Sequence, residues 1–340
     1  MFSASIVLLV LLLVGYRIWE PGKDVRDGHN DRLRNGIWLQ HGWLGDDSWF
    51  SRNGKEVQIQ YFRSLKNLET LAASLRERHI LYIFPHMAPT STEGDLSFID
   101  PEQARRFFGV FSRFKVMPWV GGIEGKQVFL NNPAWRENFA KSIGKFLREY
   151  PAASGIHINI EPMRSGNQPF LALLEEVRRQ MPQGRTLSIA AYPPSTLLHP
   201  YPDVHWNKGY YKEVAARCDL IAVMMYDTAL PNKKLYRNLM AEWTRKTIGW
   251  SKGAKILLGL PTYHDADSGY HNPKIENLEN ALLGVHAGLD RYYSIPETYE
   301  GVSLYCEWEM DDSEWRHFEE HFLKPNSELV TDPITSNPEP

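Results

Sequence analysis

The chain has 340 residues, 43% of them hydrophobic, and a formal net charge of −3. This composition allows a large buried core, and its mixed charges lack the basic stripe that marks nucleic-acid-binding proteins, so we predict no nucleic-acid partner. The length alone suits either two domains or one α/β barrel.

The two cysteines, Cys218 and Cys306, are too few for a disulfide framework. We predict two buried thiols, with a single bridge as the open alternative. No Cys/His cluster has the spacing of zinc ligands, so we predict no metal and no other cofactor.

The chain begins with an apolar run, "SIVLLVLLLVGY" at Ser5–Tyr16. Its length lies between a signal-peptide core and a minimal membrane span. No Lys or Arg precedes it and no small-x-small cleavage site follows, so residues 1–19 are interpreted as a signal anchor rather than a cleaved signal peptide. The arginines that follow would keep the rest of the chain cytoplasmic. We expect residues 20–35 to form a polar linker.

Eight short apolar segments with strand character come next, each ending in aromatic or polar residues. They are 36–41, 80–86, 114–122, 155–162, 186–193, 219–227, 255–263 and 301–309. Segments with helical periodicity fill the intervals. Ser64 is the expected N-cap of one helix, and Asp100 caps another that has Pro101 at its first position.

This alternation predicts a single-domain α/β fold, a (β/α)8 TIM barrel over residues 36–325. An open doubly wound sheet is the main rival, but no Gly-rich phosphate loop follows the first strand. We expect residues 326–340 to be a disordered tail.

The segment "GIHINIEP" carries the candidate site. Three isoleucines alternate with His157, Asn159 and Glu161, so the polar residues share the face that points into the barrel. Glu161 lies at the carboxyl end of the strand, where barrel enzymes hold their active sites, and is our candidate catalytic residue. His157 lies deeper, and a hydrogen-bonded polar layer inside the barrel is the alternative to a contact with substrate.

Four segments in chain order resemble glycoside hydrolase family 18, the family of chitinases and endo-β-N-acetylglucosaminidases. "GIHINIE" is similar to the family's Asp-x-x-Asp-x-Asp-x-Glu, "MMYD" to its Met-x-Tyr-Asp, and "GLPTY" to its Gly-(Leu/Val)-Pro-x-Tyr. Trp308 stands where the family has a sugar-stacking Trp. The three family aspartates correspond here to Ser154, His157 and Asn159, and only Glu161 is kept.

The resemblance implies a glycosidase that acts on an N-acetylhexosamine-containing glycan by substrate-assisted, retaining hydrolysis. Glu161 would be the general acid and base, while the substrate's own acetamido oxygen attacks the anomeric carbon. The pair Asn159 and Glu161 also resembles the Asn-x-Glu of glycoside hydrolase family 85, whose Asn binds the acetamido group. Tyr226 and Asp227 would contact that same group.

We expect further residues at the strand ends to bind the sugar, because flat apolar rings suit pyranose faces. The candidates for substrate binding are His157, Trp119, Tyr192, Tyr263, Trp308 and Glu307, with Trp43 and Trp49 as further aromatic residues near strand ends.

Two other functions stay open. In one, Glu161 works with a second protein carboxylate, Glu307 or Glu309, as retaining or inverting glycosidases do. In the other, the barrel binds sugar without cleaving it, as a lectin does. A sugar-cleaving body would act on the periplasmic or extracellular side, anchored or secreted, which conflicts with the orientation that the basic residues favour.

Overall fold

The structure is a computed structural model, which describes residues 2–197, 199–265 and 270–325. Parallel strands form its centre, and every pairing between neighbouring strands is parallel. The strands are β1 (Asn35–Leu39), β2 (Ile80–Pro85), β3 (Lys115–Val116), β4 (Trp119–Ile123), β5 (Gly155–Glu161), β6 (Thr186–Ala191), β7 (Leu220–Met224), β8 (Lys255–Pro261) and β9 (Tyr299–Tyr305).

The sheet closes because β3 and β4 are two halves of one barrel strand. β3 pairs with β2 and β4 pairs with β5, while β1 pairs with β9. A bridge between His86 and Trp119 carries the β2 pairing on to the start of β4. The strand predicted at 114–122 is interrupted at Pro118, which has no backbone N–H to give to the ladder. The predicted (β/α)8 barrel is therefore confirmed.

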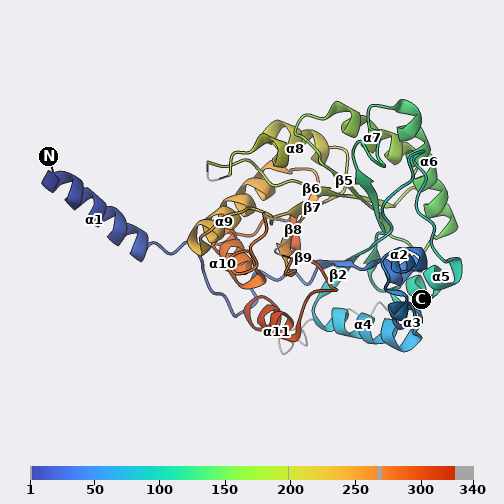
Figure 1. The fold of residues 1–340 in the computed structure, drawn as a ribbon, viewed down its shortest axis with the longest axis horizontal. Coiled ribbons are helices and arrows are strands. Elements are labelled where there is room, and N and C mark those ends of the chain that lie inside the picture. Colours follow the sequence, from blue (N-terminus) through green and yellow to red (C-terminus); the bar gives the residue numbers. More distant parts are fainter. Residues whose placement is uncertain (1, 198, 266–269, 326–340) are drawn as a thin grey trace, which may run out of the picture.

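Helices make up much of the remaining structure, and those after α1 surround the strands (Figure 1). They are α1 (Phe2–Ile18), α2 (Asp47–Arg52), α3 (Ile59–Arg63), α4 (Leu65–Glu77), α5 (Pro101–Val110), α6 (Pro133–Glu149), α7 (Gln168–Gln180), α8 (Lys208–Ala215), α9 (Lys233–Trp250), α10 (Leu278–Leu289) and α11 (Asp312–His321). Short 3₁₀ turns occur at His41–Leu44, Glu56–Gln58 and Pro202–Val204. Ser64 and Asp100 accept hydrogen bonds from the first turns of α4 and α5, as predicted.

The strands separate two apolar regions. Ile156, Ile158 and Ile160 of β5 belong to the larger one, between the strands and the helices. A smaller cluster fills the barrel interior and includes Trp38, Phe84 and Met117. The alternation read from β5 thus places its isoleucines outward and its polar side chains inward.

The two cysteines lie apart in this core. Cys218 precedes β7 and Cys306 follows β9, and both are buried and unbridged. The predicted pair of thiols is confirmed.

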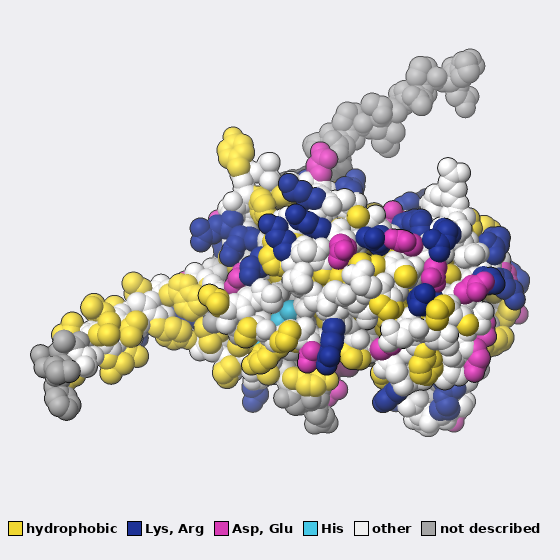
Figure 2. Space-filling view, turned by 90° about the horizontal axis from the view of Figure 1, so that it is seen from above, with side chains coloured by type: hydrophobic (Ala, Val, Ile, Leu, Met, Phe, Trp, Pro, Cys, Tyr) yellow, Lys and Arg dark blue, Asp and Glu magenta, His cyan; other side chains and the backbone are white. Residues whose placement is uncertain are grey.

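The N-terminal helix α1 projects away from the barrel (Figure 1). Its apolar side chains from Ile6 to Val14 are between 50% and 62% exposed, and Figure 2 shows them covering much of the helix surface. Among the described residues, no helix combines the length and the apolarity needed to cross a membrane.

The segment predicted as a linker packs against the barrel and forms no helix or strand before Asn35, where β1 begins. Lys23 pairs with Asp290 at 2.6 Å, and the buried Asp31 pairs with His79 at 2.5 Å. The predicted tail, 326–340, lies outside the described residues.

Candidate active site

Glu161 ends β5 at the carboxyl edge of the barrel. Asn159 Nδ2 donates a hydrogen bond to Glu161 Oε1 at 2.9 Å, and the Tyr192 hydroxyl donates to Oε2 at 3.4 Å. Burial raises the pKa of Glu161 above its ordinary value; the two hydrogen bonds oppose this, and the nearby charge of Asp227 adds to it. Glu161 therefore has the environment of a carboxyl group that holds its proton to a higher pH than an exposed carboxyl group does.

Three adjoining cavities meet at Glu161, which lines all of them. One, of about 340 Å³, lies between the ends of β1, β2 and β4 and includes Trp49 and Trp119. The second, of about 370 Å³, includes Tyr263 and Trp308. The third, of about 470 Å³, extends over the loops after β6 and β7. Together they place Glu161 within a groove across the mouth of the barrel.

Tyr226 and Asp227 follow β7 and face the same groove. Asp227 adopts the left-handed region with φ 59°, which is uncommon outside glycine and Asn/Asp residues. The Tyr263 hydroxyl donates to Asp227 Oδ1. Asp227 remains 36% exposed, so part of its carboxylate is open to the groove.

Aromatic rings form one wall of this groove around Tyr305, the last residue of β9. Tyr226 stacks on Tyr305 with centroids 5.3 Å apart, and Trp308 meets it edge-on at 5.7 Å. Trp119 lies 6.3 Å from Tyr305. Such rings present the flat apolar surface that suits a sugar face.

The structure thus brings most of the predicted residues to one groove. Those that line it are Glu161, Asn159, Tyr226, Asp227, Trp119, Tyr192, Tyr263 and Trp308.

His157 is different, because its side chain is 0% exposed. Its Nε2 accepts from Trp38 Nε1 at 3.3 Å, and its Nδ1 lies 2.8 Å from Ser188 Oγ. Burial lowers its pKa to about 3, so the ring is neutral. The expectation that His157 binds substrate is corrected: it belongs to the polar layer beneath the site.

Glu307 is also absent from the lining of these cavities, to which its neighbours Trp308 and Glu309 contribute. Burial raises its pKa to about 7, partly offset by contacts with Trp43 and with the backbone of Gln40. Its carboxyl group therefore faces the loop after β1. The expectation that Glu307 binds substrate is corrected. Trp43 is wholly buried core.

Sequence reasoning missed several lining residues. His41 and His86 face each other with centroids 3.4 Å apart, and His41 stacks on Trp49. Both histidines end predicted strands, so the position that singled out Glu161 applied to them as well. Tyr305 lies only three residues before Trp308, and the same criterion, an aromatic residue near a strand end, applied to it.

One group of side chains has the spacing of a metal site. His264, Asp311 and Glu314 offer ligand atoms within 4.8 Å of one another. Asp311, however, caps α11 by accepting from the backbone of Ser313 and Glu314, while Glu314 accepts from the backbone of Asp311. Helix capping accounts for these carboxylates.

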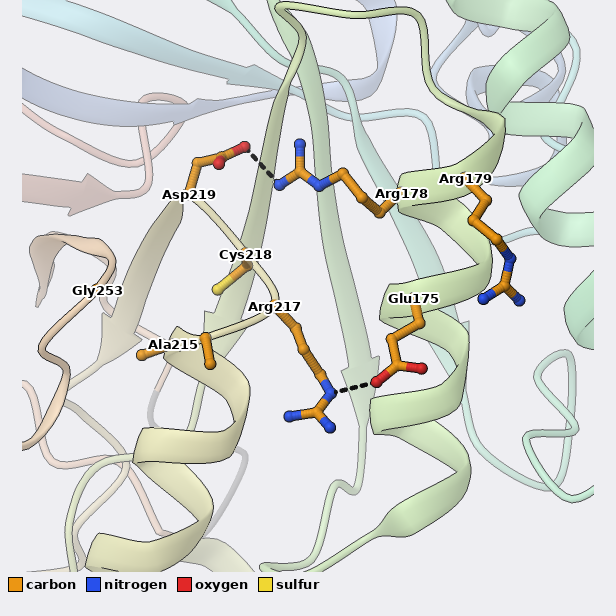
Figure 3. A pocket seen from close by; sticks show the side chains of 9 residues that line it. Glu175, Arg178, Arg179, Ala215, Arg217, Cys218, Asp219 and Gly253 are labelled. Atoms are coloured by element: carbon orange, nitrogen blue, oxygen red, sulfur yellow. Dashed lines mark hydrogen bonds and ion pairs between the residues drawn. The ribbon is translucent and has the colours of Figure 1, made fainter.

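A larger cavity, of about 850 Å³, lies at the opposite end of the barrel (Figure 3). Asp219 and Gly253, which line it, precede β7 and β8. Arg178 pairs with Asp219 at 2.6 Å and Arg217 with Glu175 at 2.8 Å. Residues at this end of a barrel usually serve stability rather than catalysis. Two of the cationic side chains that line the cavity, Arg178 and Arg217, are already paired.

The chain was compared with known proteins. The family model described as "Glycosyl hydrolases family 18" matches residues 52–328. The comparison with curated proteins finds no match.

Solved structures share the fold at low sequence identity. The spore cortex-lytic enzyme SleL of Bacillus cereus is 13% identical with a TM-score of 0.59, over 87% of this chain and 75% of that chain. A chitinase from Chromobacterium violaceum is 16% identical with a TM-score of 0.58, over 84% and 98%. A chitinase from Bacteroides thetaiotaomicron is 13% identical with a TM-score of 0.52, over 86% and 98%.

Proposed function

The chain belongs to glycosyl hydrolase family 18 and is a glycosidase, and from this premise we propose that it hydrolyses an N-acetylhexosamine-containing glycan by substrate assistance, with Glu161 as the general acid and base. The observation that carries the proposal is the position of Glu161. It lines all three adjoining cavities, and its pKa is raised by burial first and by the charge of Asp227 in addition.

In the first step, Glu161 gives its proton to the glycosidic oxygen as the acetamido oxygen of the substrate attacks the anomeric carbon. The leaving sugar departs as an alcohol, and a cyclic oxazolinium ion remains. In the second step, the Glu161 carboxylate takes a proton from water, which opens the ring with retention of configuration. No protein atom bonds to the sugar.

Asn159, Tyr226 and Asp227 orient the acetamido group in this proposal. Asn159 Nδ2 already contacts Glu161, whereas its Oδ1 has no hydrogen-bond partner in the described structure. A buried unpaired amide oxygen is costly, and a donor from the acetamido group would satisfy it. The neutral amide orients the group but supplies no negative charge.

The route with two protein carboxylates has less support. Glu307 does not line the groove, and Glu309, which does, accepts a hydrogen bond from the backbone of His264 at 2.9 Å. A lectin-like barrel remains testable beside it, since binding without cleavage would identify one.

Membrane attachment through the N-terminal segment is a further part of the proposal. The exposed apolar side chains of α1 support an anchoring role, with the barrel on the periplasmic or extracellular side where a glycan would be met. The helix would act as a tether, separate from the chemistry.

Glu161→Gln tests the proposed function. With an N-acetylglucosaminide reporter, we expect turnover to fall by a factor of about 10² to 10⁴, the usual contribution of a general acid. Binding of an N-acetylglucosamine oligomer, measured by calorimetry, should persist because the amide keeps the shape of the carboxyl group. Unchanged turnover in a folded variant would remove Glu161 from the mechanism.

A further inference from the structure

A second carboxylate, Glu276, is buried behind the active site. It lies just before α10 and is 0% exposed. Its Oε2 accepts a hydrogen bond from the backbone N–H of Thr228 at 2.9 Å, and its Oε1 has no hydrogen-bond partner. A buried carboxylate is costly unless a positive charge compensates it.

His271 lies between Glu276 and Asp227. Its Nδ1 is 3.4 Å from Asp227 Oδ1 and 3.8 Å from Glu276 Oε2. Its Nε2 is 3.1 Å from the carbonyl oxygen of Tyr263, and its ring stacks on that of Tyr263 with centroids 4.0 Å apart. The histidine is thereby held at Nε2 and on one face, while Nδ1 lies near both carboxylates without a hydrogen-bond partner in the described structure.

These contacts determine the protonation of the ring. A carbonyl oxygen only accepts, so Nε2 must carry a hydrogen. A neutral imidazole would then turn the lone pair of Nδ1 toward two carboxylates. With a hydrogen on Nδ1 as well, the imidazolium ion pairs with both. In the described structure, neither Asp227 nor Glu276 forms an ion pair with a Lys or Arg.

Asp227 is held by the same group of side chains. Its Oδ1 accepts from the Tyr263 hydroxyl and lies 3.4 Å from His271 Nδ1, while the side chain remains 36% exposed. The Thr228 N–H bound by Glu276 is the next backbone group along the chain. These contacts hold the side chain of Asp227 and the backbone N–H that follows it, and so stabilise the left-handed conformation of Asp227.

We propose that His271 and Glu276 are positioning residues that hold the Asp227 carboxylate in its orientation, so that Asp227 supplies beside Glu161 the negative charge that Asn159 lacks. The part of this inference that concerns turnover rests on the proposed function; the part that concerns the ion pair does not. The imidazolium of His271 thus connects the wholly buried carboxylate of Glu276 with the carboxylate of Asp227, which lines the groove.

The electrostatics of the group act in both directions. Burial raises the pKa of Glu276, and the hydrogen bond from the Thr228 backbone and the charge of His271 oppose this. Burial lowers the pKa of His271, but the hydrogen bond and charge of Asp227 and the charge of Glu276 outweigh it, so the pKa lies above its ordinary value. Among the described residues, Glu161 also interacts with Asp227, whose charge raises the pKa of Glu161. Tyr226, Tyr236, Tyr263 and Tyr305 interact with Asp227 as well, and burial raises their pKa values, so these tyrosines are neutral. The imidazolium is therefore present below the raised pKa and lost as the pH rises through it.

The test is an NMR titration of the intact protein labelled with ¹⁵N-histidine, with the His271 signal assigned by its absence in His271→Gln. In the wild type, we expect His271 to be protonated on both nitrogens at pH 7. In Glu276→Gln, whose amide oxygen can still accept from Thr228, the titration midpoint should fall by about one pH unit. Glu279→Gln, which removes an exposed charge from the same helix start, should leave it unchanged.

Turnover gives the second measurement. Glu276→Gln should lower kcat on the acetamido reporter about tenfold with little change in KM, and its activity should decline at a lower pH than in the wild type. A neutral His271 at pH 7 in the wild type would overturn the inference without any variant. A lowered midpoint with unchanged kcat would also overturn it, because the pair would then be purely structural.

A control separates this inference from the proposed function. Glu161→Gln should lower turnover by the factor of about 10² to 10⁴ given above and leave His271 doubly protonated. If the wild type cleaves no acetamido sugar but His271 titrates as expected, the proposed function fails while the ion pair stands.

Discussion

At the scale of single residues, the pKa of Glu161 is set by opposing influences. Burial and Asp227 raise its pKa, while hydrogen bonds from Asn159 and Tyr192 lower it. Because the general acid must be protonated, activity should be present below the folded pKa and decline as the pH rises through it. The alkaline limb of the pH profile therefore responds to these contacts, as well as to the ionisation of His271 inferred above.

Tyr192→Phe should move that limb to higher pH. The change removes a hydrogen bond that favours the carboxylate, so the pKa of Glu161 rises further and the acid keeps its proton longer. At 3.4 Å the bond is long, and we expect a shift below about one pH unit. The measurement is kcat/KM against pH; a limb displaced to lower pH would contradict the assignment.

Asn159→Ala should lower turnover about a hundredfold, comparable to the loss of one oriented hydrogen-bonding group at a reaction centre. The fold should survive, because the side chain is only partly buried. Thermal unfolding checks the fold and reporter kinetics check turnover. Equal rates in variant and wild type would make the amide a mere component of the polar layer.

The sequence predicted which face of β5 these residues share but not the depth of each. His157 and Glu161 have the same orientation and lie four residues apart, yet one is sealed among Trp38, Phe84 and Ser188 and the other opens to the groove. Depth depends on side chains contributed by other strands. His271 and Glu276 were missed for the same reason, because only the fold brings their loop behind Asp227.

At the scale of elements, asparagine begins five consecutive helices. Asn132, Asn167, Asn207, Asn232 and Asn277 each accept from the first turn of α6 to α10. These caps satisfy backbone N–H groups that have no partner within the helix. They fix where each helix starts after its strand.

Asn232→Ala should lower the free energy of unfolding by about 1 kcal/mol. Asn232 accepts from the backbone of both Lys234, at 2.9 Å, and Leu235, at 3.2 Å. Urea unfolding measures the change, and Asn232→Asp is the matched control because it keeps the accepting oxygen. Equal losses in the two variants would show that the cap is not the cause.

The spacing of apolar residues was sufficient to predict the strands and main helices. The residue type at each helix start was sufficient to predict caps such as Asp100. The break in the third barrel strand was less visible, because Pro118 lies within an apolar segment that reads as continuous. Its effect depends on whether a neighbouring strand needs that N–H, which is a property of the sheet rather than of the segment.

At the scale of the whole molecule, α1 is nearly independent of the barrel. Its end is held by Lys234, whose ammonium donates to the carbonyl oxygens of Tyr16, at 3.3 Å, and Arg17, at 3.2 Å. A variant lacking residues 2–18 should keep its melting temperature and turnover but lose sedimentation with anionic lipid vesicles. Vesicle binding that persists in the truncated protein would place the attachment elsewhere.

The barrel itself was predictable because its alternating pattern recurs along most of the chain, and four motifs in order pointed to the family. The packing of residues 20–34 was not, since polar segments are read as linkers when their partners, such as Asp290 for Lys23, lie far along the sequence.

The most direct test of substrate assistance compares two reporters with the same leaving group, one an N-acetylglucosaminide and the other a plain glucoside. Because the attacking oxygen belongs to the acetamido group, the wild-type protein should cleave the first and leave the second intact. Equal cleavage of both would contradict the account and point to a nucleophile supplied by the protein.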